Sequence, residues 1–105
     1  MRRTKTLDLD GIAITVHELT VAEVRNWEAD LSDKERKFDL VSESLMDNVS
    51  LSDIVRMSNA TMPMLDSMTP SMVDEIIAVA KELNPHFFTM RGRLMDAARL
   101  LPPTL

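Results

Sequence analysis

Few residues in this sequence could carry acid–base, nucleophilic or metal chemistry. There are two histidines, His17 and His86, and no cysteine. Neither histidine stands in an H-E-x-x-H or other metal-ligand spacing, and the lack of cysteine excludes a thiolate zinc site, a cysteine nucleophile and a disulfide framework. We therefore expect both histidines to be caps or partly exposed polar groups near the ends of elements.

The acidic side chains offer one cluster, at Glu28, Asp30, Asp33 and Glu35. Neighbouring carboxylates can share a proton or bind a cation. These four, however, span the junction between two predicted helices, and Asp33 and Glu35 fall in a first turn, where the helix dipole favours acids. There is no G-x-S-x-G nucleophile elbow, and two glycines are too few for a glycine-rich phosphate loop. We expect no catalytic residue, no metal and no cofactor, and hence a protein that is not an enzyme.

Methionine is the most informative residue type. The chain has nine, and five of them lie within residues 57–72. Methionine fills irregular gaps in a core, but it also lines surfaces that accept varied apolar partners, and both interpretations remain open. Because Pro63 interrupts helix-forming sequence, we expect a connector there and predict that Met62, Met64 and Met68 are at least partly accessible. The candidate partner-binding residues are Met57, Met62, Met64, Met68, Met72, Phe87 and Phe88.

The charge is unevenly distributed along the chain. The net charge is −5, with +3 on residues 1–6, −10 on residues 7–83 and +2 on residues 84–105. An acidic body is a poor match for nucleic acid, which needs a basic face. The acidic body is explained either as a solvated surface or as a surface that contacts the basic ends of a neighbouring copy. The second explanation predicts self-association.

Length and composition indicate one small domain over residues 1–105. The sequence is 45% hydrophobic and 28% charged, as in folded globular proteins. Its apolar runs are far shorter than the roughly 20 residues of a membrane span, and no signal sequence follows the basic start. We expect a soluble intracellular protein that does not bind membranes, with flexible ends at residues 1–4 and 102–105.

The predicted fold is mainly α, with about five short helices after an N-terminal β-hairpin over residues 5–17. Apolar and polar residues alternate on both sides of Asp10-Gly11, a pair that suits a two-residue hairpin turn. Helix-start signals occur at Thr20, Ser32, Ser50, Thr69 and Pro85. The expected apolar stripes include Val21, Val24, Trp27 and Leu31; then Phe38, Val41 and Leu45; then Val73, Ile76, Ile77, Ala80 and Leu83; and finally Phe87, Phe88 and Leu94. Trp27, Phe38, Ile76 and Leu83 are expected to be buried.

The hairpin and the residues after it resemble the opening of tail assembly chaperones of long-tailed bacteriophages and prophages. The similar stretch is VHELTVAEVRNW at residues 16–27, followed by LSDI at residues 51–54 and LNPHFF at residues 83–88. The resemblance covers most of residues 12–95 and consists of apolar and capping patterns.

This resemblance implies a function in virion assembly. Such chaperones act in the host cytoplasm and are absent from the mature virion. Many copies coat the helical tape measure protein and keep it soluble, and they help recruit tail tube subunits, often through a longer frameshifted form. Two alternatives remain: a small nucleic-acid-binding regulator that uses Arg91, Arg93 and Arg99 on one helix, and a structural tail or connector protein.

Overall fold

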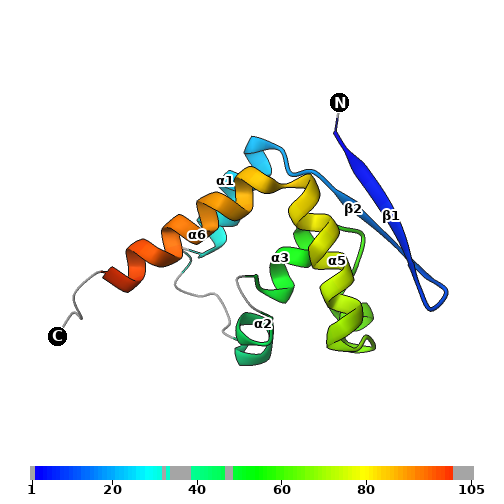
Figure 1. The fold of residues 1–105 in the computed structure, drawn as a ribbon. Helices are drawn as coiled ribbons and strands as arrows, with labels where there is room; N and C mark the ends of the chain where they lie inside the picture. The colour runs from blue at the N-terminus through cyan, green and yellow to red at the C-terminus, as the bar shows by residue number, and fades with distance from the viewer. Residues whose placement is uncertain (1, 32, 34–38, 47–48, 101–105) are drawn as a thin grey trace.

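A computed structural model describes residues 2–31, 33, 39–46 and 49–100, with the side chains of residues 95 and 98–100 excepted. It confirms a mainly helical fold behind an N-terminal hairpin, with six helices in the described part (Figure 1). The elements are β1 (Thr4–Leu9), β2 (Ile12–His17), α1 (Val21–Leu31), α2 (Leu40–Ser44), α3 (Leu51–Arg56), α4 (Met62–Asp66), α5 (Pro70–Leu83) and α6 (Pro85–Leu100).

The hairpin forms because its two turn residues tolerate positive φ. Asp10 has φ 53° and Gly11 has φ 86°, as a type I′ turn requires, and Leu9 pairs with Ile12 across it. The predicted apolar face is confirmed, since Leu9, Ile14 and Val16 are buried.

The outer edge of β2 is bonded to the protein's own chain. The His17 amide donates to the Met57 carbonyl at 2.7 Å, and the Asn59 amide donates to the Thr15 carbonyl at 3.1 Å. The hairpin therefore packs on the helices of the same chain through β2.

Helix α5 is the helix that the sequence predicted best. Thr69 caps its start, with Pro70 at the first helical position, and Asn84 follows its end. Its predicted stripe is buried, with Ile76 fully enclosed, while Asp74, Glu75, Ala78, Lys81 and Glu82 are exposed. This stripe packs against the hairpin, mostly on β2, and forms the centre of the core.

The helix-start signals at Thr20 and Ser50 are both confirmed, and each forms a capping box. The Glu23 amide donates to the Thr20 hydroxyl, and the Thr20 amide donates to the Glu23 carboxylate at 2.9 Å. Ser50 and Asp53 make the same reciprocal pair at the start of α3.

The expected helix from Ser32 differs from what is observed. The described helix, α2, begins at Leu40. The Asp39 carboxylate accepts hydrogen bonds from the Ser42 hydroxyl at 2.7 Å and from the Ser42 amide, and these bonds lower the pKa of Asp39. Val41 and Leu45 are exposed, so the stripe prediction is wrong there: this short helix packs on α3 and buries Ser42 instead. Ser32 and Phe38 lie outside the described residues.

The expected connector at Met62-Pro63-Met64 is instead a short helix, α4. Thr61 caps it, and its side chain accepts a hydrogen bond from the Met64 amide. Pro63 lies in the first turn, where a helix has no intrahelical use for the amide hydrogen that proline lacks. The prediction of a connector is wrong here, because a proline in the first turn is compatible with a helix start.

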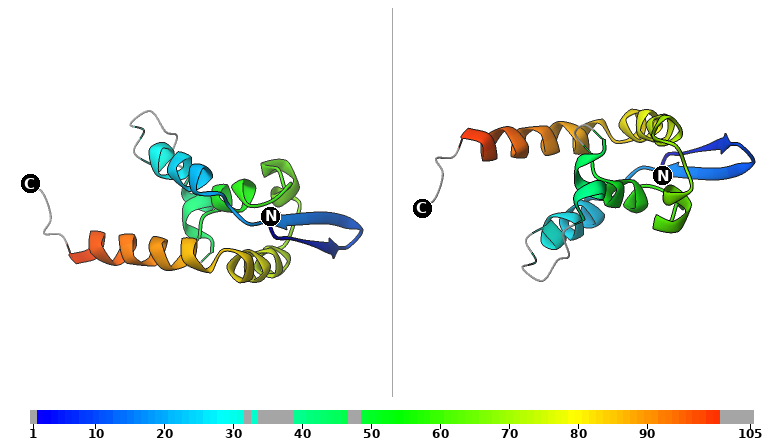
Figure 2. Two further views of the ribbon diagram at one scale, coloured as in Figure 1. Left: turned by 90° about the horizontal axis from the view of Figure 1, so that it is seen from above. Right: turned by 90° about the horizontal axis from the view of Figure 1, so that it is seen from below.

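Helices α1 and α6 give the molecule its elongated shape. Both leave the body on the side opposite the hairpin, and they diverge as they extend away from it (Figure 2). The principal extents are 50 × 31 × 22 Å. Among the described residues, no helix has both the length and the apolarity that crossing a bilayer requires.

Candidate functional site

The methionine cluster is largely part of the core. Met57 is 1% exposed and Met68 is 9% exposed, whereas Met62, Met64 and Met72 are half-buried and pack against the core. The prediction that Met68 is accessible is therefore wrong, and for Met62 and Met64 it is confirmed. Helix α3 packs against both α4 and α5, and flexible methionines fill the irregular space between these helices.

The two candidate phenylalanines lie at the other end of α5. Phe87 is buried, and Phe88 is half-buried, with the Lys81 Nζ 5.9 Å from its ring centre. The seven candidate partner-binding residues thus occupy two separate places and form no single patch.

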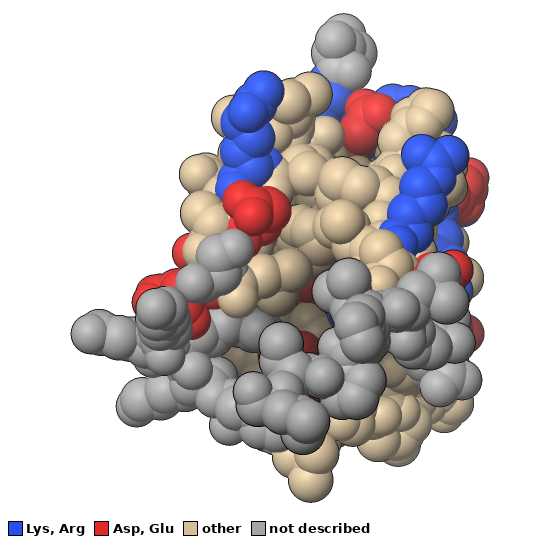
Figure 3. All heavy atoms as spheres, turned by 90° about the vertical axis from the view of Figure 1, so that its left-hand side faces the viewer, with Lys and Arg blue, Asp and Glu red and all other residues tan. Residues whose placement is uncertain are grey.

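A different surface is open and apolar: the hollow between α1 and α6, which we call the trough. We define it by Val24, Trp27 and Leu31 on α1 and by Phe87 and Leu94 on α6. Its closed end is the edge-to-face contact of Trp27 with Phe87, whose ring centres are 5.0 Å apart. Figure 3 looks toward this side and shows mostly uncharged atoms between two ridges that carry charged side chains.

Helical spacing places the α6 side of the trough on one face, where the charged Arg91 lies between Phe87 and Leu94 but is buried against Asp53. On α6, Phe87, Arg91 and Leu94 stand four and three residues apart and so share one face. Phe87 contacts α1 and Arg91 reaches α3, so this face looks inward. Leu94 continues the same face but is 46% exposed, because the helix has left the body by that point.

The inner face of α1 behaves in the same way. Trp27 is 2% exposed and Val24 is half-buried, but Leu31, one turn beyond Trp27, is 38% exposed. The expected burial of Trp27 is therefore confirmed, whereas the same apolar stripe is exposed at Leu31 and at Val21, which is 72% exposed. Each stripe begins at a buried aromatic side chain and ends at an exposed leucine.

Two pockets open at the walls of the trough. One, of about 320 Å³, lies between the starts of α1 and α6, and Val24, Leu83, Pro85 and Phe87 give it apolar walls. The other, of about 230 Å³, lies between α1 and α3 beside Trp27 and Leu31. The first pocket could admit an apolar side chain of a partner. The second is lined mostly by polar and charged residues, namely Asp30, Asp33, Ser52, Asp53 and Arg56.

A buried polar network around Asp53 fixes the closed end of the trough. One carboxylate oxygen accepts from the Trp27 indole at 2.8 Å, and the other accepts from Arg91 Nε at 3.0 Å and from the Ser50 amide at 3.0 Å. This single side chain joins α1, α3 and α6. The sequence indicated Asp53 only as part of the helix start at Ser50 and gave no sign of its two distant partners.

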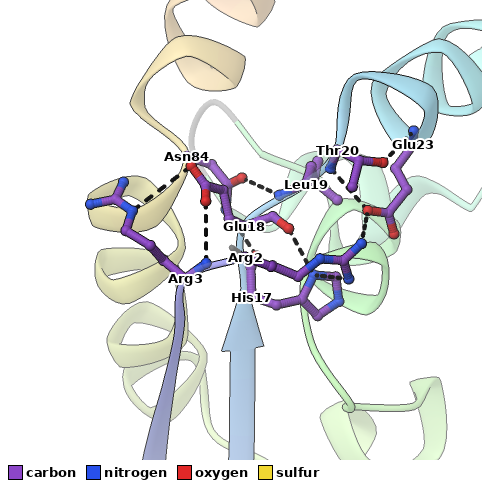
Figure 4. Close-up of polar contacts among 8 residues, drawn as sticks. All are labelled: Arg2, Arg3, His17, Glu18, Leu19, Thr20, Glu23 and Asn84. Atoms are coloured by element: carbon purple, nitrogen blue, oxygen red, sulfur yellow. Dashed lines mark hydrogen bonds and ion pairs between the residues drawn. The ribbon is translucent and has the colours of Figure 1, made fainter.

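Asn84 makes a second connection, between the hairpin and the helices (Figure 4). Its side-chain oxygen accepts from the Leu19 amide at 2.7 Å, and its amide group donates to the carbonyls of His17 and Ala80, each at 3.2 Å. The side chain is thereby satisfied although it is buried. It holds the start of α1 against the junction of α5 and α6 and so sets the angle at which the trough opens.

The basic N-terminal residues bind acids of their own chain. Arg2 pairs with Glu23 at 2.7 Å, and Lys5 pairs with Glu82 at 3.6 Å. Arg3 lies 3.8 Å from Glu18 and donates to the Leu83 carbonyl at 3.1 Å. Part of the positive charge that could contact a neighbouring copy is therefore balanced within the molecule. Arg2 and Arg3 also lie in the segment, residues 1–4, that was predicted to be flexible, and both make defined contacts there.

The capping box of α1 makes stability depend on pH. The backbone hydrogen bond from Thr20, helped by the Thr20 hydroxyl and by the charge of Arg2, lowers the pKa of Glu23. The stabilisation is therefore present above about pH 4.5, the ordinary value for glutamate, and is lost as pH falls through the lower folded pKa. We expect Glu23→Ala to cost about 0.5–1 kcal/mol at pH 7, because the carboxylate is partly exposed and lies in the first turn of the helix.

Thermal melts of the parent and Glu23→Ala from pH 7 to pH 3 test this expectation, and the two curves should converge at acid pH. Glu23→Gln keeps the hydrogen-bonding shape without the charge and is the matched control. A gap between parent and Glu23→Ala that stayed constant across the range would contradict the assignment.

The remaining chemical candidates do not assemble into a site. His17 is half-buried with Nδ1 3.2 Å from the Glu18 carbonyl, and His86 is exposed at the start of α6. Asp30 pairs with Arg56, and Glu35 lies outside the described residues. Among the residues that the structure describes, no three histidine or acidic side chains are placed to hold a metal ion.

Comparison of the chain with family models, with curated proteins and with solved structures found no match.

Proposed function

We propose that this protein is a non-enzymatic assembly chaperone that binds an amphipathic helix of its partner in the trough. The observation that carries the proposal is the pair of inner stripes on α1 and α6, which begin at buried Trp27 and Phe87 and end at exposed Leu31 and Leu94. Large exposed apolar side chains that line a hollow are typical of an interaction surface. A third helix placed between two diverging helices would cover both stripes at once.

The resemblance of residues 16–27 to tail assembly chaperones supplies the identity of the partner. We propose that it is the tape measure protein of a long-tailed phage or prophage, and that the chaperone keeps it soluble in the host cytoplasm and is absent from the finished virion. The apolar lining of the trough suits that task, because apolar contacts bind helical surfaces of varied sequence with little sequence specificity. Recruitment of the tail tube protein belongs to the same proposal.

Binding by one copy is expected to be weak. The exposed part of the trough offers few side chains, and association must first offset the loss of free motion of two molecules. Many copies along one long helix would gain from high effective concentration if the copies also contact one another. Self-association is therefore part of the proposed mechanism.

The trough is favoured over the methionine cluster as the binding surface. Met57 and Met68 are enclosed, and the half-buried Met62, Met64 and Met72 already pack on the core. The nucleic-acid alternative is weakened by Arg91, because that residue is buried against Asp53 and is not presented to a duplex.

Co-purification tests the proposed function. The chain is co-expressed with a helical fragment of the tape measure protein from the same phage or prophage. Leu94→Asp places a charge in the trough and should reduce recovery of the fragment roughly tenfold or more, because an aspartate cannot be buried without a partner. Stability should change by less than about 0.5 kcal/mol, since Leu94 is exposed.

The matched control is Ala29→Asp. Ala29 is exposed on α1 and lies on the face opposite Trp27 and Leu31, so this variant should recover the fragment like the parent. If Leu94→Asp bound the fragment as well as Ala29→Asp does, the trough would not be the binding site.

A further inference from the structure

The two edges of the hairpin differ in how their backbone groups are used. In a two-residue hairpin the pair that flanks the turn is hydrogen-bonded, and the pairs alternate from there, so Thr4, Thr6 and Asp8 direct their amides and carbonyls away from β2. On β2 the corresponding outward residues include Thr15 and His17, and residues 57–59 bond both of them. Within the part of the chain that the structure describes, nothing bonds the outward backbone groups of β1.

The β1 edge also lacks most of the usual protection against pairing, and charged side chains, Lys5 and Asp8, are the one such device in its sequence. Natural edges are interrupted by proline, by a bulge or by cover from another element. β1 contains no proline, its register with β2 is continuous, and Thr4, Thr6 and Asp8 are all exposed. Figure 1 shows β1 as the outermost strand, at the end of the molecule away from α6.

The charges along this edge are self-complementary. Basic residues Arg2, Arg3 and Lys5 stand at the start of the strand, and Asp8 and Asp10 stand at its end. An antiparallel copy centred on Thr6 would set Thr4 opposite Asp8. It would also bring Arg2, which pairs with Glu23 of its own chain, beside the acidic turn of the second copy, where the guanidinium can contact both acids. Each strand's basic start would then face its partner's acidic end, and the same contact would be made twice about a two-fold axis.

We propose that a second copy of this chain binds along β1, antiparallel and centred on Thr6, to form a four-stranded sheet across the dimer. The pairs Thr4–Asp8, Thr6–Thr6 and Asp8–Thr4 each exchange two backbone hydrogen bonds in this register. The small contact makes a weak, reversible dimer that weakens as salt rises.

The pairing gives the proposed chaperone a contact between copies that leaves the trough open. The hairpin and the diverging ends of α1 and α6 lie at opposite ends of the molecule (Figure 2). The proposed dimer can be tested separately from binding in the trough, because the test uses the isolated chain with no partner present.

Amide hydrogen exchange followed by NMR tests the register residue by residue. The full chain is measured at about ten micromolar and at about one millimolar, a range that spans the affinity expected of a small interface. The amides of Thr4, Thr6 and Asp8 should become protected at the higher concentration, while the amides of Leu7 and Leu9, already bonded within the hairpin, change little. A chain that stays monomeric at one millimolar in low salt, or that associates without protecting these three amides, overturns the proposal.

A pair of substitutions at the centre of the register gives the second measurement. Thr6→Pro removes the outward amide and should weaken dimerisation roughly tenfold or more, since each copy loses a backbone hydrogen bond. Thr6→Val keeps the amide and, like the proline variant, lacks the 3.0 Å hydroxyl contact with Thr15, so it should dimerise like the parent. Dimerisation of Thr6→Pro at parental strength in sedimentation experiments overturns the proposal, and the exchange data on the parent remain decisive if the proline variant does not fold.

Discussion

Replacing Ile76 with aspartate is expected to unfold the protein. Ile76 is 0% exposed, lies at the middle of α5 and belongs to the core that joins the hairpin to the helices. An aspartate there is a charge without a partner in an apolar environment, and a substitution of that kind costs more than about 4 kcal/mol. A domain of this size has a total stability of only about 5–10 kcal/mol, so little or none would remain.

Circular dichroism melts and urea titrations measure this effect. Ala78→Asp is the matched control, since Ala78 lies on the exposed face of the same helix and its substitution should cost only the difference in helix propensity, about 1 kcal/mol or less. An Ile76→Asp variant that melted like the parent would show that α5 does not carry the core.

The second large effect is expected at Asp53. Asp53→Ala leaves the Arg91 guanidinium buried without its counter-charge and leaves the Trp27 indole without an acceptor. Breaking a buried pair in this way costs about 3–5 kcal/mol, much more than the pair contributes when it is intact. The same variant also loses the capping box of α3.

A double-mutant cycle separates these contributions. Adding Arg91→Met to Asp53→Ala should recover part of the loss, because the unpaired charge is gone. Asp30→Ala removes the acid of the more exposed Asp30–Arg56 pair and should cost less than about 1 kcal/mol. Equal losses for Asp53→Ala and Asp30→Ala would contradict the buried network, as would strict additivity in the cycle.

The sequence predicted well those elements that are fixed by local signals. Asp10-Gly11 determines the hairpin through backbone conformation, and Thr69-Pro70 with a regular apolar stripe determines α5. These signals act within a few residues, so no knowledge of the tertiary structure is needed to read them. The local signal at Pro63 was misleading, because proline occurs both after the end of a helix and in the first turn of one. Only its position relative to the N-cap distinguishes the two cases.

The candidate site was harder to predict because it depends on how helices are arranged. A stripe such as Val24, Trp27 and Leu31 indicates which face of a helix is apolar, but not whether another element covers it. The trough exists because α1 and α6 diverge from the contact of Trp27 with Phe87, and that angle follows from the distant bonds of Asp53 and Asn84. The high methionine count pointed to residues 57–72, but packing density, which decides between core and surface, cannot be read from composition.

Site-specific photo-crosslinking in cells that co-express the tape measure fragment would test the trough most directly. A photoreactive phenylalanine analogue at Leu94 or Leu31 should crosslink to the fragment, because both positions line the trough and are partly exposed. The same analogue at Ala78, on the exposed face of α5, should not crosslink. Crosslinks from Ala78 together with none from Leu94 and Leu31 would contradict the proposed binding of a partner helix between α1 and α6.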